Sequence, residues 1–316
     1  HFGSIAGIGK EQAWQSITPD AHGDWLRQRD DSFGEFIALG DKKATEIRLF
    51  ANYSGGVQTN RDAWVFNFSR VSLISNISSM VAKYGAELSR FNASYALTDK
   101  KARDVEAANF LDKDPTLISW SRSLRSDVVK NKSLSVDVAR VTTSTYRPFT
   151  KQWMYFDRHL NEMVLQMPRI FPEAGSENLI ITFKENWVGK GQFALITDSI
   201  LEQQTDGGAQ CFPLYLYDEA AQDVDDGLFA GQPTKGRRRR DAITDEGLAH
   251  FQSAYPGEKL TKEDLFYYVY GLLHSSDYRE RYADNLAKEL PRIPRVKIAA
   301  DFWAFSKAGR ALAELH

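Results

Sequence analysis

Apolar residues recur every three or four positions from Val71 to Phe91, with mostly polar residues between them. This spacing gathers them on one face of a helix and predicts a long amphipathic helix. A second helix is predicted over Lys101 to Leu111. A third is predicted over "TLISWSRSLRSDVVKNK", because it follows Pro115 and proline suits the first turn of a helix. Together they predict a helical region over residues 71–135.

The pattern changes after Lys132. Four segments are rich in Val, Ile, Thr, Tyr and Phe and are separated by Gly, Pro and Asn, which is typical of strands. They are "VDVARVTTSTYRPFTKQWMYFD", "NLIITFK", "GQFALITDSI" and "AQCFPLYLYD". We therefore expect a β-rich core over residues 136–235. In the first segment, alternation places Phe149, Lys151, Trp153 and Tyr155 on one face.

The last part of the chain, residues 236–316, is predicted to be helical. Thr261 and Asp264 are spaced as a capping box for a helix that reaches His274, and a further helix is expected from Ser276 to Leu290. The run "DLFYYVYGLLH" is apolar almost all round, which indicates burial. The fold class expected is α+β, with a central β-rich core, flanking helices and a helical C-terminal region.

Composition describes a globular chain. Its 316 residues are 42% hydrophobic and 26% charged, enough for one large or two ordinary domains. The single cysteine excludes a disulfide framework and a multi-cysteine zinc site, and it fits a reducing, cytoplasmic location. No apolar run is long enough to cross a membrane. The chain opens without methionine, which suggests a fragment of a longer protein.

The net charge of −2 conceals a segregation of charge along the chain. Residues 115–169 hold nine Lys or Arg against four acids, an excess of five positive charges, whereas residues 202–231 hold seven acids and no Lys or Arg. Separate stretches of opposite sign create local fields that a small total hides. The motif "KGRRRRD" lies in a Gly/Asp/Pro-rich linker over residues 218–241 and indicates either a sequence-independent phosphate contact or a solvated linker.

Catalytic and metal-binding motifs are absent from the sequence. "GSIAGIGKE" departs from a phosphate-binding loop at Ser4 and Glu11, and the histidines lack the spacing of a metal pair. His22 beside Asp24 is either a base with its orienting carboxylate or a loop histidine packed on Trp25. We therefore expect no catalytic residue and no metal site.

The segment "TYRPFTKQWMYFDRH" crowds rings and cations together. An unpaired buried charge is very costly, so one face of the strand must meet solvent. That face suits a phosphate backbone, with cations and rings for the polynucleotide; the alternative is a half-buried strand whose rings are core and whose charges are solvated. The candidate DNA-binding residues here are Arg147, Lys151, Trp153, Tyr155 and Arg158.

Three further groups are candidates for DNA contact. Arg122 and Arg125 share a helix face, with Lys132 seven residues beyond Arg125, and this stripe suits phosphates. "TNRDAW" and "TFKENWVGKGQF" carry side chains suited to reading base edges; the first is alternatively a loop held by an Arg–Asp pair and the second an exposed hairpin loop. From these two segments the candidates are Asn60, Arg61, Asp62, Lys184, Asn186, Lys190 and Gln192.

An ordered series of blocks resembles the C-terminal part of type ISP restriction-modification enzymes. The blocks include "ITPDAHGDW", "YSGGVQTNRDAWVFNFS", "WSRSLRSDV", "YRPFTKQWMYFDRHL" and "DLFYYVYGLLHSSDYRERYADNLAKELPRIP", and the likeness runs from about Trp14 to the end of the chain. The resemblance implies a target-recognition domain that reads double-stranded DNA for a polypeptide with a nuclease, an ATP-driven motor and an adenine-N6 methyltransferase.

The chemistry of such an enzyme is missing from this chain. There is no Asn-Pro-Pro-Tyr signature, no Walker pair and no nuclease core, so no cofactor is expected here. S-adenosylmethionine, ATP and Mg are implied only for the missing upstream domains, which are expected partners together with double-stranded DNA. Residues 1–70 would form the junction with the methyltransferase. The alternatives are a self-contained enzyme with an unrecognised acid-base site and a protein- or polysaccharide-binding scaffold.

Overall fold

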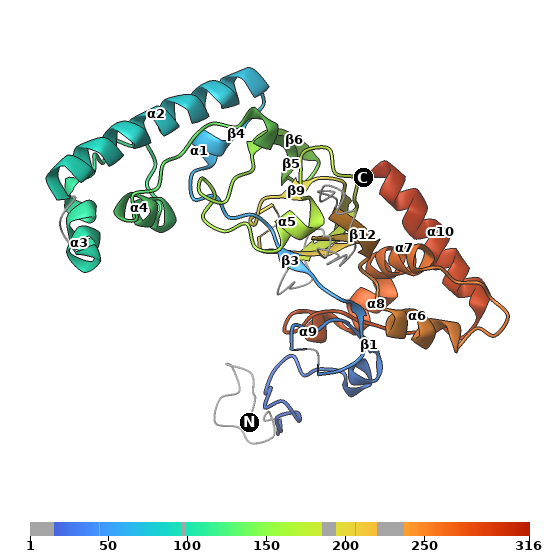
Figure 1. Cartoon of the computed structure of the whole chain (residues 1–316). Helices are drawn as coiled ribbons and strands as arrows, with labels where there is room; N and C mark the ends of the chain where they lie inside the picture. Colours follow the sequence, from blue (N-terminus) through green and yellow to red (C-terminus); the bar gives the residue numbers. More distant parts are fainter. Residues whose placement is uncertain (1–15, 44, 96–98, 185–193, 206, 220–236) are drawn as a thin grey trace, which may run out of the picture. The chain divides into compact units, whose positions relative to one another are not determined.

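The computed structural model describes residues 16–316 apart from residues 44, 96–98, 185–193, 206 and 220–236 (Figure 1). The chain divides into two compact units. The described residues of unit 1 lie between 16 and 49 and between 245 and 310. Those of unit 2 are the rest of the description, including residues 311–316. Both units mix helices and strands, so the predicted α+β class is confirmed.

Unit 1 packs helices beside a small sheet. The strand order is β13 (Arg292–Ile293), β1 (Ile37–Gly40) and β2 (Arg48–Phe50), with β2 at the boundary of the unit. The 3-10 helix η3 covers Asp31–Glu35. The helices are α6 (Asp245–Gln252), α7 (Lys262–Leu273), α8 (Ser276–Arg281), α9 (Ala283–Leu286) and α10 (Ala299–Leu315), whose residues from 311 onward belong to unit 2.

Helix α7 forms the core of unit 1. Its predicted capping box is confirmed, since Thr261 accepts from the Asp264 amide while the Asp264 carboxylate accepts from the Thr261 amide. Every residue from 265 to 273 is buried, as the apolar run indicated. The helix meets α10 so closely that a Cβ on Gly309 would lie 2.0 Å from the Tyr267 carbonyl oxygen. Only glycine fits there.

The helix predicted from Ser276 to Leu290 is wrong in one respect. It is broken into α8 and α9 at Tyr282, whose φ of −104° and ψ of 21° leave the helical region. Tyr282 is buried against Phe33, with ring centroids 5.1 Å apart. Aromatic packing therefore accompanies the break.

Unit 2 contains the three predicted helices. They are α2 (Arg70–Tyr95), α3 (Lys100–Phe110) and α4 (Arg122–Val129), preceded by the short helix α1 (Asp62–Val65). Helix α2 buries Leu73, Ile77, Met80, Tyr84, Leu88 and Phe91, the face that periodicity indicated. Helix α4 begins later than predicted, because Ser121 is its N-cap and accepts from the Leu124 amide. Pro115 lies in a turn instead.

The strands of unit 2 form separate sheets. One has the order β4 (Phe66–Asn67), β6 (Thr150–Tyr155), β5 (Val141–Arg147) and β9 (Ile200–Leu201). Another has the order β3 (Ser54–Gly55), β10 (Ala209–Pro213), β7 (Ile180–Lys184) and β8 (Ala194–Thr197). The 3-10 helix η4 (Val138–Arg140) precedes β5, and the short helix α5 (Met167–Ile170) lies between β6 and β7. All four predicted strand segments contain strands.

The arginine run is not a linker. Strand β12 (Arg237–Asp241) pairs antiparallel with β11 (Tyr215–Glu219), so this part of the predicted linker is wrong. Asp218 accepts hydrogen bonds from both Arg240 and Arg169, and Arg239 lies 4.3 Å over the Tyr215 ring. A carboxylate and an aromatic ring on the neighbouring strand β11 thus hold Arg240 and Arg239 in strand conformation.

The turn of the β5–β6 hairpin is strained. Arg147 pairs with Thr150, and Pro148 and Phe149 lie between them. Phe149 has a φ of 58°, in the left-handed region that costs a non-glycine residue roughly 1–2 kcal/mol.

No helix among the described residues is long and apolar enough to cross a membrane.

Candidate nucleic-acid interface

Helix α4 presents two arginines to solvent. Leu124 and Val128 are fully buried on one side of the helix, so Arg122 and Arg125 project from the other side and are exposed. Neither guanidinium has an ion-pair partner within the described part of the chain. Both remain free to bind an anion.

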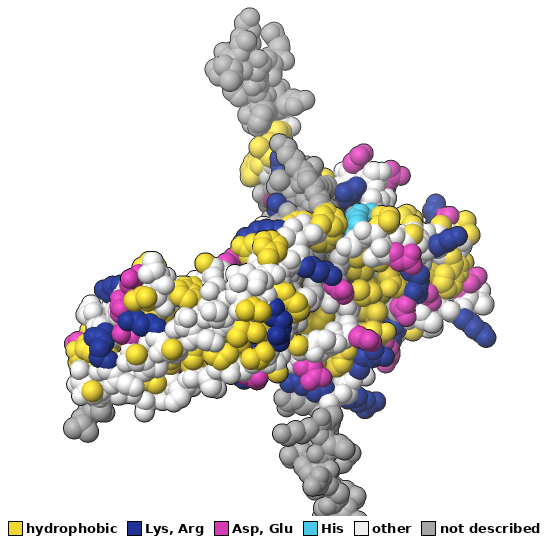
Figure 2. Space-filling model, turned by 90° about the horizontal axis from the view of Figure 1, so that it is seen from above, with side chains coloured by type: hydrophobic (Ala, Val, Ile, Leu, Met, Phe, Trp, Pro, Cys, Tyr) yellow, Lys and Arg dark blue, Asp and Glu magenta, His cyan; other side chains and the backbone are white. Residues whose placement is uncertain are grey.

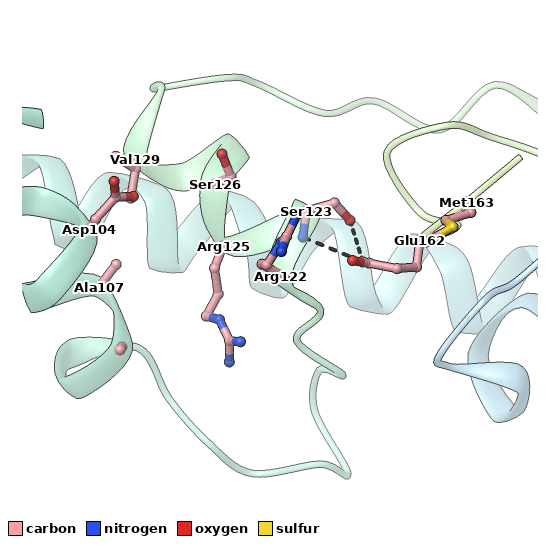
Figure 3. A pocket seen from close by; sticks show the side chains of 10 residues that line it. Asp104, Ala107, Arg122, Ser123, Arg125, Ser126, Val129, Glu162 and Met163 are labelled. Atoms are coloured by element: carbon pink, nitrogen blue, oxygen red, sulfur yellow. Dashed lines mark hydrogen bonds between the residues drawn. The ribbon is translucent and has the colours of Figure 1, made fainter. Parts of the chain in front are cut away.

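These arginines line a cavity of about 520 Å³ between α3, α4 and the loop that follows β6 (Figure 3). In Figure 3 the Arg125 guanidinium extends from α4 into the open space beside α3. Its lining includes acidic, basic, hydroxyl and apolar side chains. The lining residues are Asp104, Ala107, Ala108, Arg122, Ser123, Arg125, Ser126, Val129, Glu162 and Met163.

One wall of the cavity is fixed by Glu162. Its carboxylate accepts a 2.7 Å hydrogen bond from the Ser123 hydroxyl. Burial opposes ionisation of this group, but the hydrogen bonds from Ser123 and Ser121 lower the pKa of Glu162 below its usual value. The carboxylate therefore fastens α4 to the loop after β6.

Lys132 does not extend the stripe on α4, contrary to the sequence prediction. Asn131 adopts a φ of 54°, its amide donates to the Val128 carbonyl, and the Lys132 amide donates to the Asp127 carbonyl. These bonds form a Schellman motif that reverses the chain after Val129. The Lys132 ammonium then returns to the buried Asp127 carboxylate at 3.1 Å.

Arg103 on α3 holds the helices around the cavity in place. Its guanidinium donates to the Val129 carbonyl at 3.1 Å, to the Tyr95 carbonyl at 2.7 Å and to the Asn92 side chain at 2.7 Å. It thereby ties α3 to the last turns of α2 and α4, whose carbonyls lack partners within their own helices. Arg103 is buried, so this cation is structural.

The two predicted cations on either side of the hairpin turn are neutralised. Arg147 donates to Glu202 at 2.8 Å, and the Lys151 ammonium lies 2.6 Å from Asp198. Tyr155 is 1% exposed, and its hydroxyl accepts from the Asp137 amide. These three side chains are therefore no part of a trough of free cations and rings.

Two other predicted residues of this segment remain accessible. Arg158 is exposed, and no partner for it occurs among the described residues. Trp153 is half-buried, with the Arg70 guanidinium 5.9 Å from its ring centroid. Sequence reasoning missed Arg70, because the contact joins the start of α2 to β6 and only the pairing of β4 with β6 brings them together.

The loop with Asn60, Arg61 and Asp62 is built around a buried arginine. Arg61 is 4% exposed and donates to the Leu160 carbonyl at 3.2 Å, and burial lowers its pKa to about 10. Asp62 accepts from the Tyr146 hydroxyl at 3.1 Å rather than pairing with Arg61. Only Asn60 is exposed, with a left-handed φ of 56°.

The remaining sequence candidates are mostly outside the description. Lys184 is half-buried at the end of β7. Asn186, Lys190 and Gln192 lie outside the described residues, as do Ser4 and Glu11 of the glycine-rich opening segment.

The possible acid-base pair in unit 1 is occupied by ion pairs. Asp24 lies 3.0 Å from Arg29 and 2.8 Å from Lys288, and the hydrogen bond from Lys288 lowers its pKa. A carboxylate held in this way is a weak base. Across the described ranges, no group of acidic, histidine or cysteine side chains could hold a metal ion.

Comparison with known proteins gives one family. The profile of the type ISP C-terminal specificity domain matches residues 48–316. No curated protein matches the chain significantly. Three solved structures are similar over nearly the whole chain.

The first is a nuclease-deletion mutant of the type ISP restriction-modification enzyme LlaGI with a DNA substrate mimic: 32% identity, TM-score 0.77, 96% of this chain and 25% of that chain. The second is the ATP-dependent type ISP restriction-modification enzyme LlaBIII bound to DNA, with 33% identity and a TM-score of 0.77; the match covers 98% of this chain and 18% of that chain. The third is a DrdV–DNA complex, with 31% identity and a TM-score of 0.78; the match covers 96% of this chain and 27% of that chain. The chain therefore spans about a quarter or less of the proteins that it resembles.

Proposed function

We propose that this chain, which belongs to the family of type ISP C-terminal specificity domains, reads a specific sequence in double-stranded DNA. The three similar structures are all complexes with DNA or a DNA mimic. Each covers this chain almost completely, so the likeness extends to both of its units.

The observation that carries the proposal at the level of side chains is the pair of free arginines on α4. Arg122 and Arg125 are three residues apart and exposed beside a cavity, and neither is neutralised by a described carboxylate. Guanidinium groups bind phosphates through paired hydrogen bonds, so α4 supplies sequence-independent affinity. Base reading is proposed for accessible side chains elsewhere in unit 2, among them Asn60.

The chain acts within a longer polypeptide in this proposal. Its upstream domains would carry the nuclease, the ATP-driven motor and the methyltransferase, with ATP, Mg and S-adenosylmethionine as their cofactors. This chain would hold the duplex in register while a base is flipped into the methyltransferase. We assign no catalytic residue to it, and the engagement of Asp24 by Arg29 and Lys288 removes support from the alternative acid-base site.

Affinity selection tests the proposal. The chain is incubated with a pool of random-sequence duplexes, and the bound fraction is amplified and sequenced over several rounds. A specificity domain enriches one asymmetric sequence, because mismatches in a recognised site typically cost about 1–3 kcal/mol each. A pool that binds without enrichment, or that does not bind, contradicts sequence reading by this chain.

A further inference from the structure

The tip of the β5–β6 hairpin carries a residue that the turn disfavours. Pro148 occupies the first central position and Phe149 the second, where φ is 58°. A proline followed by a left-handed residue is the pattern of a type II turn, which favours Gly or Asn at the second position. Phenylalanine at this position keeps the backbone strained, and such strain persists where function or packing requires it.

Packing does not account for the choice of phenylalanine. Phe149 is 62% exposed, whereas Phe66 and Tyr155 in the same sheet are buried. The ring of Phe149 makes a T-shaped contact with the His316 imidazole, with centroids 5.5 Å apart. Most of an apolar ring therefore faces solvent from a strained backbone position.

The base of the hairpin is stiffened by side chains on both of its strands. The Arg147 guanidinium lies over the Tyr146 ring at 4.0 Å and bonds to Glu202, and Lys151 bonds to Asp198. Thr145 adds hydroxyl contacts to Thr197 at 2.7 Å and Ser199 at 2.8 Å. The tip is thus held before any ligand arrives, which lowers the entropy that binding would cost.

The same ion pairs also neutralise the carboxylates beside the tip. The carboxylates of Asp198 and Glu202 would repel phosphates if they were unpaired, but each has a cation within hydrogen-bonding distance. The hairpin tip therefore approaches a polyanion as a nearly neutral, apolar point.

One exposed ring on a rigid turn is too small for a stable protein interface, which takes about 800 Å² from each partner. It suits insertion between two stacked base pairs, where a single apolar side chain unstacks a step and kinks the duplex. We propose, on the basis of the proposed function, that Phe149 is a wedge that enters one base step of the bound duplex. Pyrimidine–purine steps unstack most easily, so the wedge adds specificity for such a step without a hydrogen bond to a base.

The test places 2-aminopurine, whose fluorescence rises when it is unstacked, at successive positions of the duplex that the wild-type chain enriches. Wild type raises the signal several-fold at one step. Phe149→Asn, which suits the left-handed turn, removes the rise and weakens binding by roughly tenfold. Its melting temperature is not lowered, because the strain is relieved. Phe149→Leu keeps an apolar wedge and retains the rise.

Phe68→Asn is the matched control, since Phe68 is 72% exposed and lies outside the hairpin. It leaves the fluorescence rise in place. Phe149→Gly provides a second variant suited to the turn. A rise that persists in both Phe149→Asn and Phe149→Gly, or no rise in wild type bound to its enriched duplex, overturns the wedge and leaves the proposed function standing. A wild-type chain that binds no duplex overturns both.

Discussion

The Arg147 guanidinium donates to the Glu202 carboxylate over 2.8 Å, between residues that are far apart in sequence and joined by the β5–β9 pairing. Glu202 is buried, whereas Arg147 keeps much of its side chain in solvent. The pair turns a cation of the aromatic segment into a structural partner. The role of Arg147 is to pair with a buried carboxylate. Its loss should therefore lower the stability of the fold more than the affinity for DNA.

Arg147→Ala should destabilise the chain by about 1–2 kcal/mol, because it leaves the Glu202 carboxylate without its cation. Urea denaturation measures the change. Lys151→Ala is the control: its pair with Asp198 is exposed on both sides, and such pairs contribute at most about 1 kcal/mol. Equal losses in the two variants would contradict the assignment of Arg147.

Burial of Glu202 should also make the stability of the fold depend on pH. Burial raises its pKa above the usual 4.5, and the nearby Asp62 carboxylate adds to the rise. The folded chain therefore holds this proton more tightly than the unfolded chain. This contribution to stability is fully present below the unfolded pKa and is lost as pH rises through the folded pKa.

The free energy of unfolding of wild type, minus that of Glu202→Gln, should accordingly be larger at about pH 4 than at about pH 7. Chemical denaturation of both proteins at each pH gives this difference. A difference that does not change with pH would show that Glu202 is not desolvated in solution.

Arg103 should be the most sensitive cation of the helical region. Arg103→Ala removes donors from the Val129 and Tyr95 carbonyls and should cost about 3 kcal/mol, because a buried and a part-buried acceptor lose a charged partner. Arg103→Lys should recover only part of this, since an ammonium lacks the planar fork. Lys101→Ala, exposed on the same helix, is the control and should leave the unfolding midpoint nearly unchanged.

Sequence patterns predicted the helices and strands better than the contacts that their side chains make. The period of α2, the capping box of α7 and the β5–β6 strands are local signals, and local signals are readable from spacing. The start of α4 was misplaced because Pro115 is a helix-start signal only when a helix follows it directly, and Ser121 supplies the cap instead.

The candidate interface was predicted less well, because the partners of its side chains come from distant segments of the chain. Nothing within "TYRPFTKQW" shows that Glu202 and Asp198 neutralise its cations, since both carboxylates come from a distant segment. Arg61 reads as a polar loop residue, but the fold buries it beside the Leu160 carbonyl. The free arginines of α4 were found because helical spacing alone places them on one face.

Asp218 controls two arginines of unit 2. Its carboxylate binds Arg169 and Arg240, and these hydrogen bonds lower its pKa. Asp218→Asn should release both guanidinium groups and strengthen binding to random-sequence duplexes a few-fold at low salt. Fluorescence anisotropy measures the affinity. Asp245→Asn is the control, because it removes an equal charge from an ion pair in unit 1 whose carboxylate is exposed.

Weaker binding by Asp218→Asn than by its control would mean that the strand pair β11–β12 loses its structure when the two arginines are released. Circular dichroism of the variant tests for that loss of structure.

The most direct test of DNA recognition by this chain is the salt dependence of duplex binding in wild type and in Arg122→Ala with Arg125→Ala. Each phosphate contact contributes about 0.9 to the slope of log affinity against log salt. The double variant should lose about 1.8 of that slope and weaken all sequences alike, whereas Lys259→Ala with Lys307→Ala, two exposed lysines of unit 1, should not. An unchanged slope in the α4 variant, or wild-type binding that ignores salt, would contradict the account.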